Sequence, residues 1–323
     1  MKQPRGWLKL TAVLAAVGIL AGCAAPTAAP STGGELKGTI TASGAFALYP
    51  LMVKWGEEFQ KLHPDVQFDI SAGGAGKGMT DALSGQADIG MVSREIKADE
   101  EKQGAYWVSV TKDAVFGIVN AKNPVLQELK SKGVSREMLI DIYVTGKIKT
   151  WGEVVGKPEI TDEIHVYTRS DAAGAPETWA KYLDNKKQED LLGIGVFGDP
   201  GITDAVAKEP LGIGYNNLGY AYDAASGNPI SGIDVLPIDV NADGQIDANE
   251  TITTKTQAIT AVAANHYPSP PARALNVVTK GKPSGVVQAF ILWTLTDGQQ
   301  FVDSAGYIPL TKALLDDGIA KLK

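Results

Sequence analysis

The sequence predicts an α/β protein of two lobes, each built from a sheet with helices on its faces. From residue 36 onward, short runs of β-branched residues alternate with helical patterns, which is typical of helices that flank a sheet. The chain has 323 residues, more than one hydrophobic core usually serves, so two lobes are expected. With 44% hydrophobic and 21% charged residues, the composition excludes a disordered chain and a fibrous rod.

The individual elements follow from the spacing of apolar residues. These residues recur at helical spacing from Leu51 to Leu62, and they alternate, as in a half-buried strand, from Val66 to Ile70. The sequence predicts strands at 38–42, 66–70, 87–92 and 274–279, and helices at 50–62, from Met79 onward, at 284–304 and at 310–322.

Charge and residue counts exclude several classes of protein. A formal net charge of −7 argues against a protein that coats nucleic acid. The single cysteine allows no internal disulfide and no zinc site built from cysteines. His63, His165 and His266 lie far apart in the sequence, which argues against a histidine metal site.

The N-terminal segment is typical of an exported protein. Lys2, Arg5 and Lys9 precede an apolar run over residues 10–21, which is too short to span a bilayer but fits a secretory signal. The run ends in Leu-Ala-Gly-Cys23, which resembles the lipobox of exported lipoproteins and implies a lipidated Cys23. We therefore expect a signal peptide at 1–22, a flexible tether at 23–36, and a protein held to the outer side of the cell membrane.

Three segments share a design that suits the binding of an anion. At 43–50, 72–78 and 169–179, an expected strand ends, small residues turn the chain, and an expected helix begins. The unpaired N–H groups of a helix's first turn and the helix dipole both favour negative charge there. The glycines at 193, 195 and 198 are a different case: Asp199-Pro200 follows them, so we expect neither a helix start nor a nucleotide site.

Taken together, these motifs resemble the periplasmic phosphate-binding proteins, the receptor subunits of phosphate ABC importers. The resemblance runs from residue 38 to the C-terminus and rests on the order and spacing of the segments 43–55, 88–94, 142–151, 169–179, 211–215, 267–268 and 297–310.

This resemblance implies a two-lobed periplasmic-binding-protein fold of type II, with the ligand in a cleft between lobes that close around it. It places two crossing strands near 114–120 and 273–279. The implied domains are lobe 1 at 37–115 and 274–323, and lobe 2 at 116–273.

The resemblance also implies the ligand-binding residues, although this chain departs from the family pattern. The family has Ser-Gly-Thr where Ala173-Gly174-Ala175 stands here, so two hydroxyl donors are missing. Each lost hydrogen bond to a charged ligand costs about 1.5–3 kcal/mol. The candidates are Ser43, Ala45, Phe46, Ala47, Gly74, Ala75, Ser93, Arg94, Arg169, Ser170, Ala173, Gly174 and Ala175.

A separate motif in lobe 2 predicts a calcium site. Residues 239–250 fit the twelve-residue EF-hand loop, with Gly244 at the sharp turn and Ile246 as the apolar plug. A strand is expected before the loop, so the loop stands alone and calcium would be structural. The expected ligands are Asp239, Asn241, Asp243, Gln245, Asp247 and Glu250.

The favoured hypothesis is a monomeric, lipid-anchored receptor that binds phosphate, delivers it to an ABC permease, and catalyses no reaction. Sulfate, molybdate or tungstate is an alternative ligand, and the missing hydroxyls also allow a sensory or interaction protein with a degenerate site. A hydrolase of phosphate esters is disfavoured because no GxSxG nucleophile motif is present.

Overall fold

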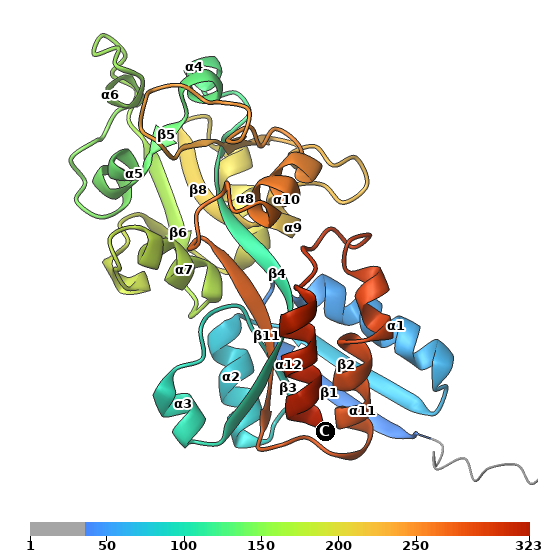
Figure 1. Ribbon diagram of the computed structural model, residues 1–323. Coiled ribbons are helices and arrows are strands. Elements are labelled where there is room, and N and C mark those ends of the chain that lie inside the picture. The colour runs from blue at the N-terminus through green and yellow to red at the C-terminus, as the bar shows by residue number, and fades with distance from the viewer. Residues whose placement is uncertain (1–35) are drawn as a thin grey trace, which may run out of the picture. The chain divides into compact units, whose positions relative to one another are not determined.

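The computed structural model describes residues 36–323 (Figure 1). The predicted signal peptide, Cys23 and nearly all of the tether lie outside the described residues. Among residues 36–323, no helix combines the length and the apolar character that crossing a bilayer requires.

The described chain contains one large mixed sheet and one small one. The large sheet has nine strands and the order β2-β1-β3-β11-β4-β8-β6-β7, with β9 also paired to β4. Its strands are β1 (Gly38–Gly44), β2 (Val66–Ala72), β3 (Ile89–Val92), β4 (Ala105–Asn120), β6 (His165–Arg169), β7 (Ile194–Val196), β8 (Gly212–Asn217), β9 (Ile233–Leu236) and β11 (Ala272–Lys280). The small sheet pairs β5 (Val134–Ser135) with β10 (Ile238–Asp239).

Two strands connect the halves of the large sheet. The first part of β4 pairs antiparallel with β11, from Ala105 opposite Lys280 to Ala114 opposite Ala272. From Val115 onward, β4 pairs instead with β8 and β9. The predicted crossing strands near 114–120 and 273–279 are therefore confirmed as parts of β4 and β11.

The buried apolar side chains form two clusters that lie on either side of this crossing. We call residues 38–113 and 273–323, which surround one of these clusters, lobe 1. We call residues 114–272, which surround the other cluster, lobe 2. Trp55 and Phe59 are buried in lobe 1, and Trp151, Trp179 and Tyr215 in lobe 2. The domain boundaries expected from the sequence stay a prediction, because a core cluster does not show that a part folds on its own.

Helices cover both faces of the sheet, as the alternating pattern predicts. Figure 1 shows α1, α11 and α12 on one side of the lobe 1 sheet and α2 on the other. The helices are α1 (Tyr49–Leu62), α2 (Ala75–Ser84), α3 (Ala98–Lys102), α4 (Leu126–Lys132), α5 (Arg136–Tyr143), α6 (Trp151–Val155), α7 (Gly174–Tyr182), α8 (Gly198–Lys208), α9 (Leu218–Ala221), α10 (Lys255–Ala263), α11 (Gly285–Thr294) and α12 (Lys312–Leu322).

Two predictions about helices are wrong. The helix expected at 284–304 ends at Thr294, and a short 3-10 helix, Asp297–Phe301, follows it. The indole N–H of Trp55 donates to the Gly298 carbonyl at 2.8 Å, and a Cβ on Gly298 would lie 2.9 Å from the Trp293 carbonyl oxygen. Close packing of α1 against this glycine therefore redirects the chain.

The second wrong prediction concerns the start of a helix after the glycines at 193, 195 and 198. Helix α8 begins at Gly198, so Asp199 and Pro200 lie in its first turn. Proline fits there because a first-turn N–H has no partner inside the helix to lose. This turn carries a residue of the functional site.

Candidate functional site

The anion-binding segments predicted from the sequence meet where the two lobes approach each other. They meet around a narrow gap, which we call the interlobe gap. Lobe 1 lines it with Ala45, Phe46, Gly74, Ala75 and Ser93, and lobe 2 with Arg169, Ala173, Gly174, Ala175, Asp199 and Asn217.

The ends of three strands and the starts of three helices build this gap. Strands β1, β2 and β6 end at Gly44, Ala72 and Arg169, immediately before the chain turns into the gap. Helices α2, α7 and α8 begin at Ala75, Gly174 and Gly198, and the first N–H groups of a helix have no partner inside it. Helix starts from both lobes therefore lie at one place, where a first turn favours negative charge, although the N–H of Gly76 already donates to the Ala172 carbonyl at 3.1 Å.

Some of the expected backbone donors are already engaged. The N–H of Ala45 donates to the Met91 carbonyl at 2.9 Å, and the N–H of Gly74 donates to the Gly44 carbonyl at 3.0 Å. These bonds hold the two loops of lobe 1 against the sheet. Ala45 and Gly74 still line the gap and limit its width.

Glycine is required where the lobes touch. A Cβ on Gly174 would collide with the side chain and backbone of Ser93, which is itself buried. Gly74 has a φ of +91°, and a Cβ there would lie 2.8 Å from the Ala172 carbonyl oxygen of lobe 2. The small residues in these loops therefore permit the close approach of the lobes.

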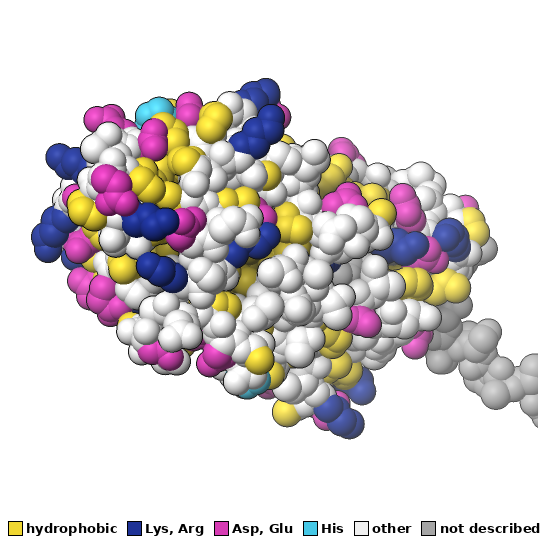
Figure 2. Space-filling view, turned by 90° about the horizontal axis from the view of Figure 1, so that it is seen from above, with side chains coloured by type: hydrophobic (Ala, Val, Ile, Leu, Met, Phe, Trp, Pro, Cys, Tyr) yellow, Lys and Arg dark blue, Asp and Glu magenta, His cyan; other side chains and the backbone are white. Residues whose placement is uncertain are grey.

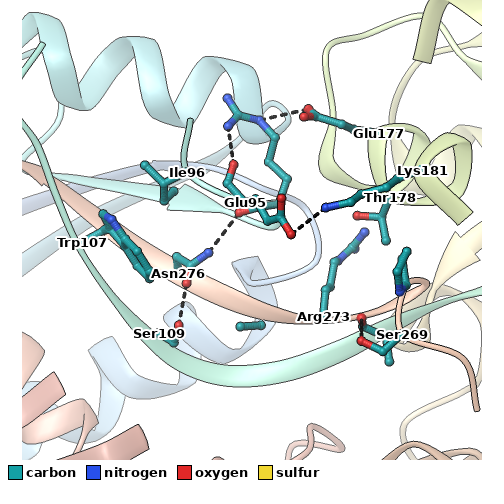
Figure 3. Close-up of a pocket in the computed structure, with 14 residues that line it drawn as sticks. Glu95, Ile96, Trp107, Ser109, Glu177, Thr178, Lys181, Ser269, Arg273 and Asn276 are labelled. Atoms are coloured by element: carbon teal, nitrogen blue, oxygen red, sulfur yellow. Dashed lines mark hydrogen bonds and ion pairs between the residues drawn. The ribbon is translucent and has the colours of Figure 1, made fainter. Parts of the chain in front are cut away.

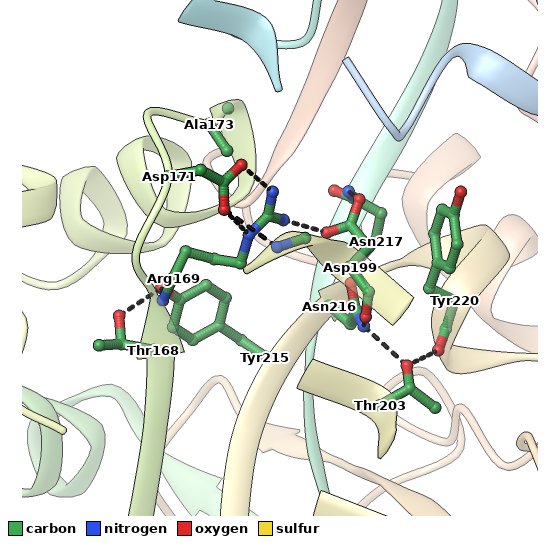
Figure 4. Close-up of polar contacts among 12 residues, drawn as sticks. Thr168, Arg169, Asp171, Ala173, Asp199, Thr203, Tyr215, Asn216, Asn217 and Tyr220 are labelled. Carbon is green, nitrogen blue, oxygen red and sulfur yellow. Dashed lines mark hydrogen bonds and ion pairs between the residues drawn. The ribbon is translucent and has the colours of Figure 1, made fainter. Parts of the chain in front are cut away.

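Arg169 is the central charged group of the site. Its side chain is 1% exposed. Its Nε donates to Asp171 Oδ1 at 2.7 Å and its Nη2 to Asp171 Oδ2 at 2.5 Å, while Nη1 donates to Asp199 (Figure 4). The Phe46 ring lies 5.4 Å from its guanidinium carbon. Burial alone would lower the pKa of Arg169, but the nearby carboxylates of Asp199 and Asp171 raise it, so the side chain stays charged.

Asp199 was missed by the sequence analysis. It is 1% exposed, and its Oδ2 accepts a hydrogen bond from Asn217 Nδ2 at 2.7 Å. Burial raises the pKa of Asp199 above its ordinary value, although the positive charge of Arg169 opposes the shift. Burial also opposes ionisation of Asp171, but its hydrogen bond with Arg169 holds that pKa below the ordinary value. The two carboxylates around Arg169 therefore differ in how readily they take up a proton.

A second buried ion pair, Arg273 with Asp113, lies next to residues of the gap. Arg273 donates from Nη1 to the Gly174 carbonyl at 2.8 Å and from Nη2 to Asn217, and its Nη2 lies 3.4 Å from Asp113 Oδ2. Burial raises the pKa of Asp113 to about 6, against the positive charge of Arg273. Through these contacts, β11 of lobe 1 fixes the first turn of α7 and the amide of Asn217.

Four of the thirteen candidate residues do not line the gap. Ser43 is buried and donates from Oγ to Asp81 Oδ2 at 2.5 Å. Ser170 is exposed, and its N–H bonds to the Val196 carbonyl. Ala47 lies inside the lobe 1 core, and Arg94 binds carboxylates beside the gap. Their roles in binding an anion stay predictions.

The loop at 239–250 keeps its oxygen-bearing side chains close to its own backbone. Asp239 accepts the N–H groups of Asp243 and Gly244 at 3.2 and 2.8 Å, and Glu250 accepts that of Val240 at 2.8 Å. Asp239 and Glu250 are buried, and Gly244 has a φ of +81°. Within residues 36–323, no three His, Cys, Asp or Glu side chains come together closely enough to hold a metal ion. The chemistry of the donors, oxygen throughout, fits calcium.

Comparison with known sequences gives consistent results. A family model described as a PBP superfamily domain matches residues 29–298. The chain is 29% identical over 288 residues to the phosphate-binding protein PstS of Bacillus subtilis, covering 87% of this chain and 84% of that protein. It is 28% identical to the phosphate-binding protein PstS of Methanocaldococcus jannaschii, covering 93% and 90%.

Solved structures agree with this fold. A Clostridium perfringens protein, assigned to phosphate ABC transport and crystallised with bound phosphate, superposes with a TM-score of 0.69 at 24% identity, covering 85% of this chain and 100% of that one. An ABC-type phosphate transport receptor from Vibrio cholerae gives a TM-score of 0.60 at 19% identity, covering 84% and 100%. The two-lobed α/β fold expected from the sequence is confirmed.

Proposed function

The chain belongs to the PBP superfamily, and from this membership and the geometry of the gap we propose that it is a receptor for phosphate. The lobes close around one phosphate ion in the interlobe gap, and the closed receptor delivers it to the permease of an ABC importer. Binding and release are the whole activity, with no covalent step. The observation that carries the proposal is Arg169, which is buried and oriented at a gap lined by helix starts from both lobes.

Arg169 supplies the positive charge, and its neighbours fix its position. The two parallel hydrogen bonds that Arg169 donates to Asp171 lock the guanidinium plane. A rigid, dry donor binds an oxyanion well because no ordering of the side chain is needed on binding. The first N–H groups of α2 and α7 add donors that do not depend on the missing hydroxyls.

The charges around the gap favour an oxyanion that carries a proton. The guanidinium of Arg169 is already paired with two carboxylates, Asp171 and Asp199, and that of Arg273 lies 3.4 Å from Asp113, so little positive charge at the gap is left unpaired. A fully ionised anion such as sulfate would meet a carboxylate of Asp199 with no proton between them. Hydrogen phosphate can donate its proton to such a carboxylate, which makes phosphate the favoured ligand over sulfate, molybdate and tungstate.

Isothermal titration tests the function. The full chain, solubilised in mild detergent and stripped of bound anions, is titrated with phosphate, sulfate, molybdate and tungstate. We expect sub-micromolar binding of phosphate and far weaker binding of sulfate. If only one of the other anions binds, that anion and not phosphate is the ligand. If none of the four anions binds, the receptor function is refuted.

The location follows from the predicted export signal. We propose that Cys23 is lipidated and holds the receptor to the outer side of the cell membrane. The variant Cys23→Ser should appear in the soluble extracytoplasmic fraction, whereas the wild-type protein should partition with membranes. Equal partitioning of both forms into the soluble fraction would contradict the anchor.

We also propose that the loop at 239–250 binds Ca²⁺ as a structural ion. Asp239, Asn241, Asp243, Asp247 and Glu250 would supply side-chain oxygens and Gln245 its carbonyl. Calcium should raise the melting temperature of the wild-type protein but not that of Glu250→Gln, and Mg²⁺ should have little effect. Phosphate affinity should be the same with and without calcium if the ion only stabilises lobe 2.

A further inference from the structure

A cluster of charged residues bridges the two lobes beside the interlobe gap. Arg94, Glu95 and Lys97 follow β3 in lobe 1, and Glu177 and Lys181 lie on α7 of lobe 2. We call these five residues the charged bridge. Figure 3 shows Glu95 and Lys181 reaching toward each other from opposite sides, and their Oε1 and Nζ atoms are 2.6 Å apart.

Arg94 is held in lobe 1 and extends one further bond to lobe 2. Its Nη1 and Nη2 donate to the two oxygens of Glu100 at 2.9 and 2.6 Å, within lobe 1. Its Nε lies 3.1 Å from Glu177 Oε2, across the lobe boundary. Although burial lowers it, the pKa of Arg94 is raised by the hydrogen bond with Glu100 and the charge of Glu177. These carboxylates occupy the guanidinium that the sequence suggested as an anion ligand.

Glu177 receives a second cation from lobe 1. Lys97 Nζ lies 3.3 Å from Glu177 Oε1, so Glu177 is shared between Arg94 and Lys97. Its side chain is 35% exposed, whereas that of Arg94 is 8% exposed. The charged bridge therefore has a sheltered contact at Arg94 and open contacts around it.

Two cavities flank the charged bridge. One has a volume of about 510 Å³ and the other about 460 Å³, and Arg94, Glu177 and Lys181 line both. Each cavity is lined by residues of both lobes. The ion pairs thus lie between cavities wide enough for water. When the lobes separate, water can therefore hydrate the charged groups, and no unpaired charge remains buried.

An aromatic contact across the gap has a different chemistry. Phe46 of lobe 1 meets Phe197 of lobe 2 edge to face, with ring centroids 6.1 Å apart. Salt screens ion pairs at exposed positions but hardly affects contacts between aromatic rings. The charged bridge therefore gives the lobe contact a dependence on ionic strength that this aromatic contact lacks.

We propose that the charged bridge is a latch, in which Glu177 and Lys181 dock onto Arg94, Glu95 and Lys97 when the lobes close and thereby slow release of the bound anion. Arg94 is then a positioning residue that aligns the lobes and does not itself touch the ligand. The latch rests on the proposed function only for the identity of the anion. Its effect on the distance between the lobes is independent of it.

The test compares Glu177→Gln with the wild-type full chain. Phosphate release, followed by stopped flow, should be about fivefold faster in Glu177→Gln. Raising salt from about 50 to about 500 mM should accelerate release from the wild type and have much less effect on the variant. Glu128→Gln is the matched control, because Glu128 pairs with Lys157 inside lobe 2 and is 29% exposed. This control should behave as the wild type does.

A charge exchange distinguishes the latch from a general structural role. Glu95→Lys and Lys181→Glu should each speed phosphate release by about threefold, and the double variant should restore the wild-type rate, because it recreates the pair with its signs exchanged. Release rates that are unchanged in Glu177→Gln, or a double variant no slower than the single ones, would overturn the latch.

A distance measurement separates failure of the latch from failure of the proposed function. Spin labels at Lys61→Cys and Lys147→Cys, in a Cys23→Ser background, report the distance between the lobes with or without an anion. If the wild type binds no phosphate, the proposed function fails, and the distance between the lobes then decides by itself whether the latch exists. A shift to longer distances in Glu177→Gln or at high salt supports the latch, and an unchanged distribution refutes it.

Discussion

The two lobes contribute different chemistry to the interlobe gap. Lobe 1 presents small side chains, the hydroxyl of Ser93, the ring of Phe46 and the first N–H groups of α2. Lobe 2 presents the charged groups, Arg169 and Asp199, already joined to each other by an ion pair. We therefore expect lobe 2 to determine which anion binds, and lobe 1 to cover the anion and exclude water.

The charges on the surface do not add a strong field of one sign to the charged groups that lobe 2 contributes. On the face drawn in Figure 2, basic and acidic side chains are interspersed. Mixed surface charges largely cancel beyond a Debye length of about 8–10 Å. We therefore expect selectivity to come from the buried groups at the gap.

Removal of the central charge should have the largest effect. Arg169→Met should lower phosphate affinity by at least about 100-fold, since two charge-assisted hydrogen bonds are lost. It should also lower the free energy of unfolding by about 3–5 kcal/mol, because Asp171 and Asp199 would remain buried without their partner. Titration and chemical denaturation measure both effects. Arg136→Met, a more exposed arginine of lobe 2, is the control for binding and should leave phosphate affinity unchanged.

The next largest effect should be on selectivity. Asp199→Asn keeps the shape of the side chain but removes its negative charge, so a fully ionised anion is no longer repelled. We expect the preference for phosphate over sulfate to fall about tenfold in competitive titration. Asp204→Asn, an exposed carboxylate on the same helix, should leave the preference unchanged. If Asp199→Asn did so too, lobe 2 would not set selectivity through this carboxylate.

The behaviour of Asp113 gives a prediction about pH. Its pKa of about 6 exceeds its ordinary value of 3.8, so the folded protein holds this proton more tightly than the unfolded chain does. Its contribution to stability is therefore complete below about pH 4 and is lost as pH rises through about 6. Relative to Asp113→Asn, the wild type should gain a few degrees of melting temperature between pH 7 and pH 5. A constant difference would contradict the raised pKa.

The smallest effect on binding is expected at Ser43. Its hydroxyl is bound to Asp81 and does not line the gap, so Ser43→Ala should leave phosphate affinity unchanged. The free energy of unfolding should fall by about 1 kcal/mol. Ser93→Ala, which removes a hydroxyl at the gap, should instead weaken phosphate binding severalfold. If Ser43→Ala weakened phosphate binding and Ser93→Ala did not, lobe 1 would bind the anion through Ser43 instead of Ser93.

Sequence patterns predicted the walls of the site well. Strand ends followed by small residues and helix starts are local features, and the edge of a sheet brings them together. Local patterns identified the segments around Ala45, Gly74 and Gly174, and the family resemblance placed them at one cleft. Arg169 was predicted from the resemblance to the family, which has an arginine at the start of the segment around Gly174.

The remaining features depend on contacts between distant residues. Asp199 was overlooked because Pro200 was read as a barrier to a helix, although proline is well tolerated in a first turn. Arg94 looked like an anion ligand because the sequence does not reveal that Glu177, far along the chain, lies 3.1 Å away. Ser43 looked like a donor because its bond to Asp81 forms only after β1 and α2 pack together.

The continuity of β4 has a consequence for how the protein unfolds. Its 16 residues pair with β11 in lobe 1 and with β8 and β9 in lobe 2. Melting of either core would release backbone hydrogen bonds that the other core shares, so the two halves are energetically coupled through one strand. Calorimetry should therefore record a single cooperative transition, and a pause between two lobes unfolding separately under force should be absent.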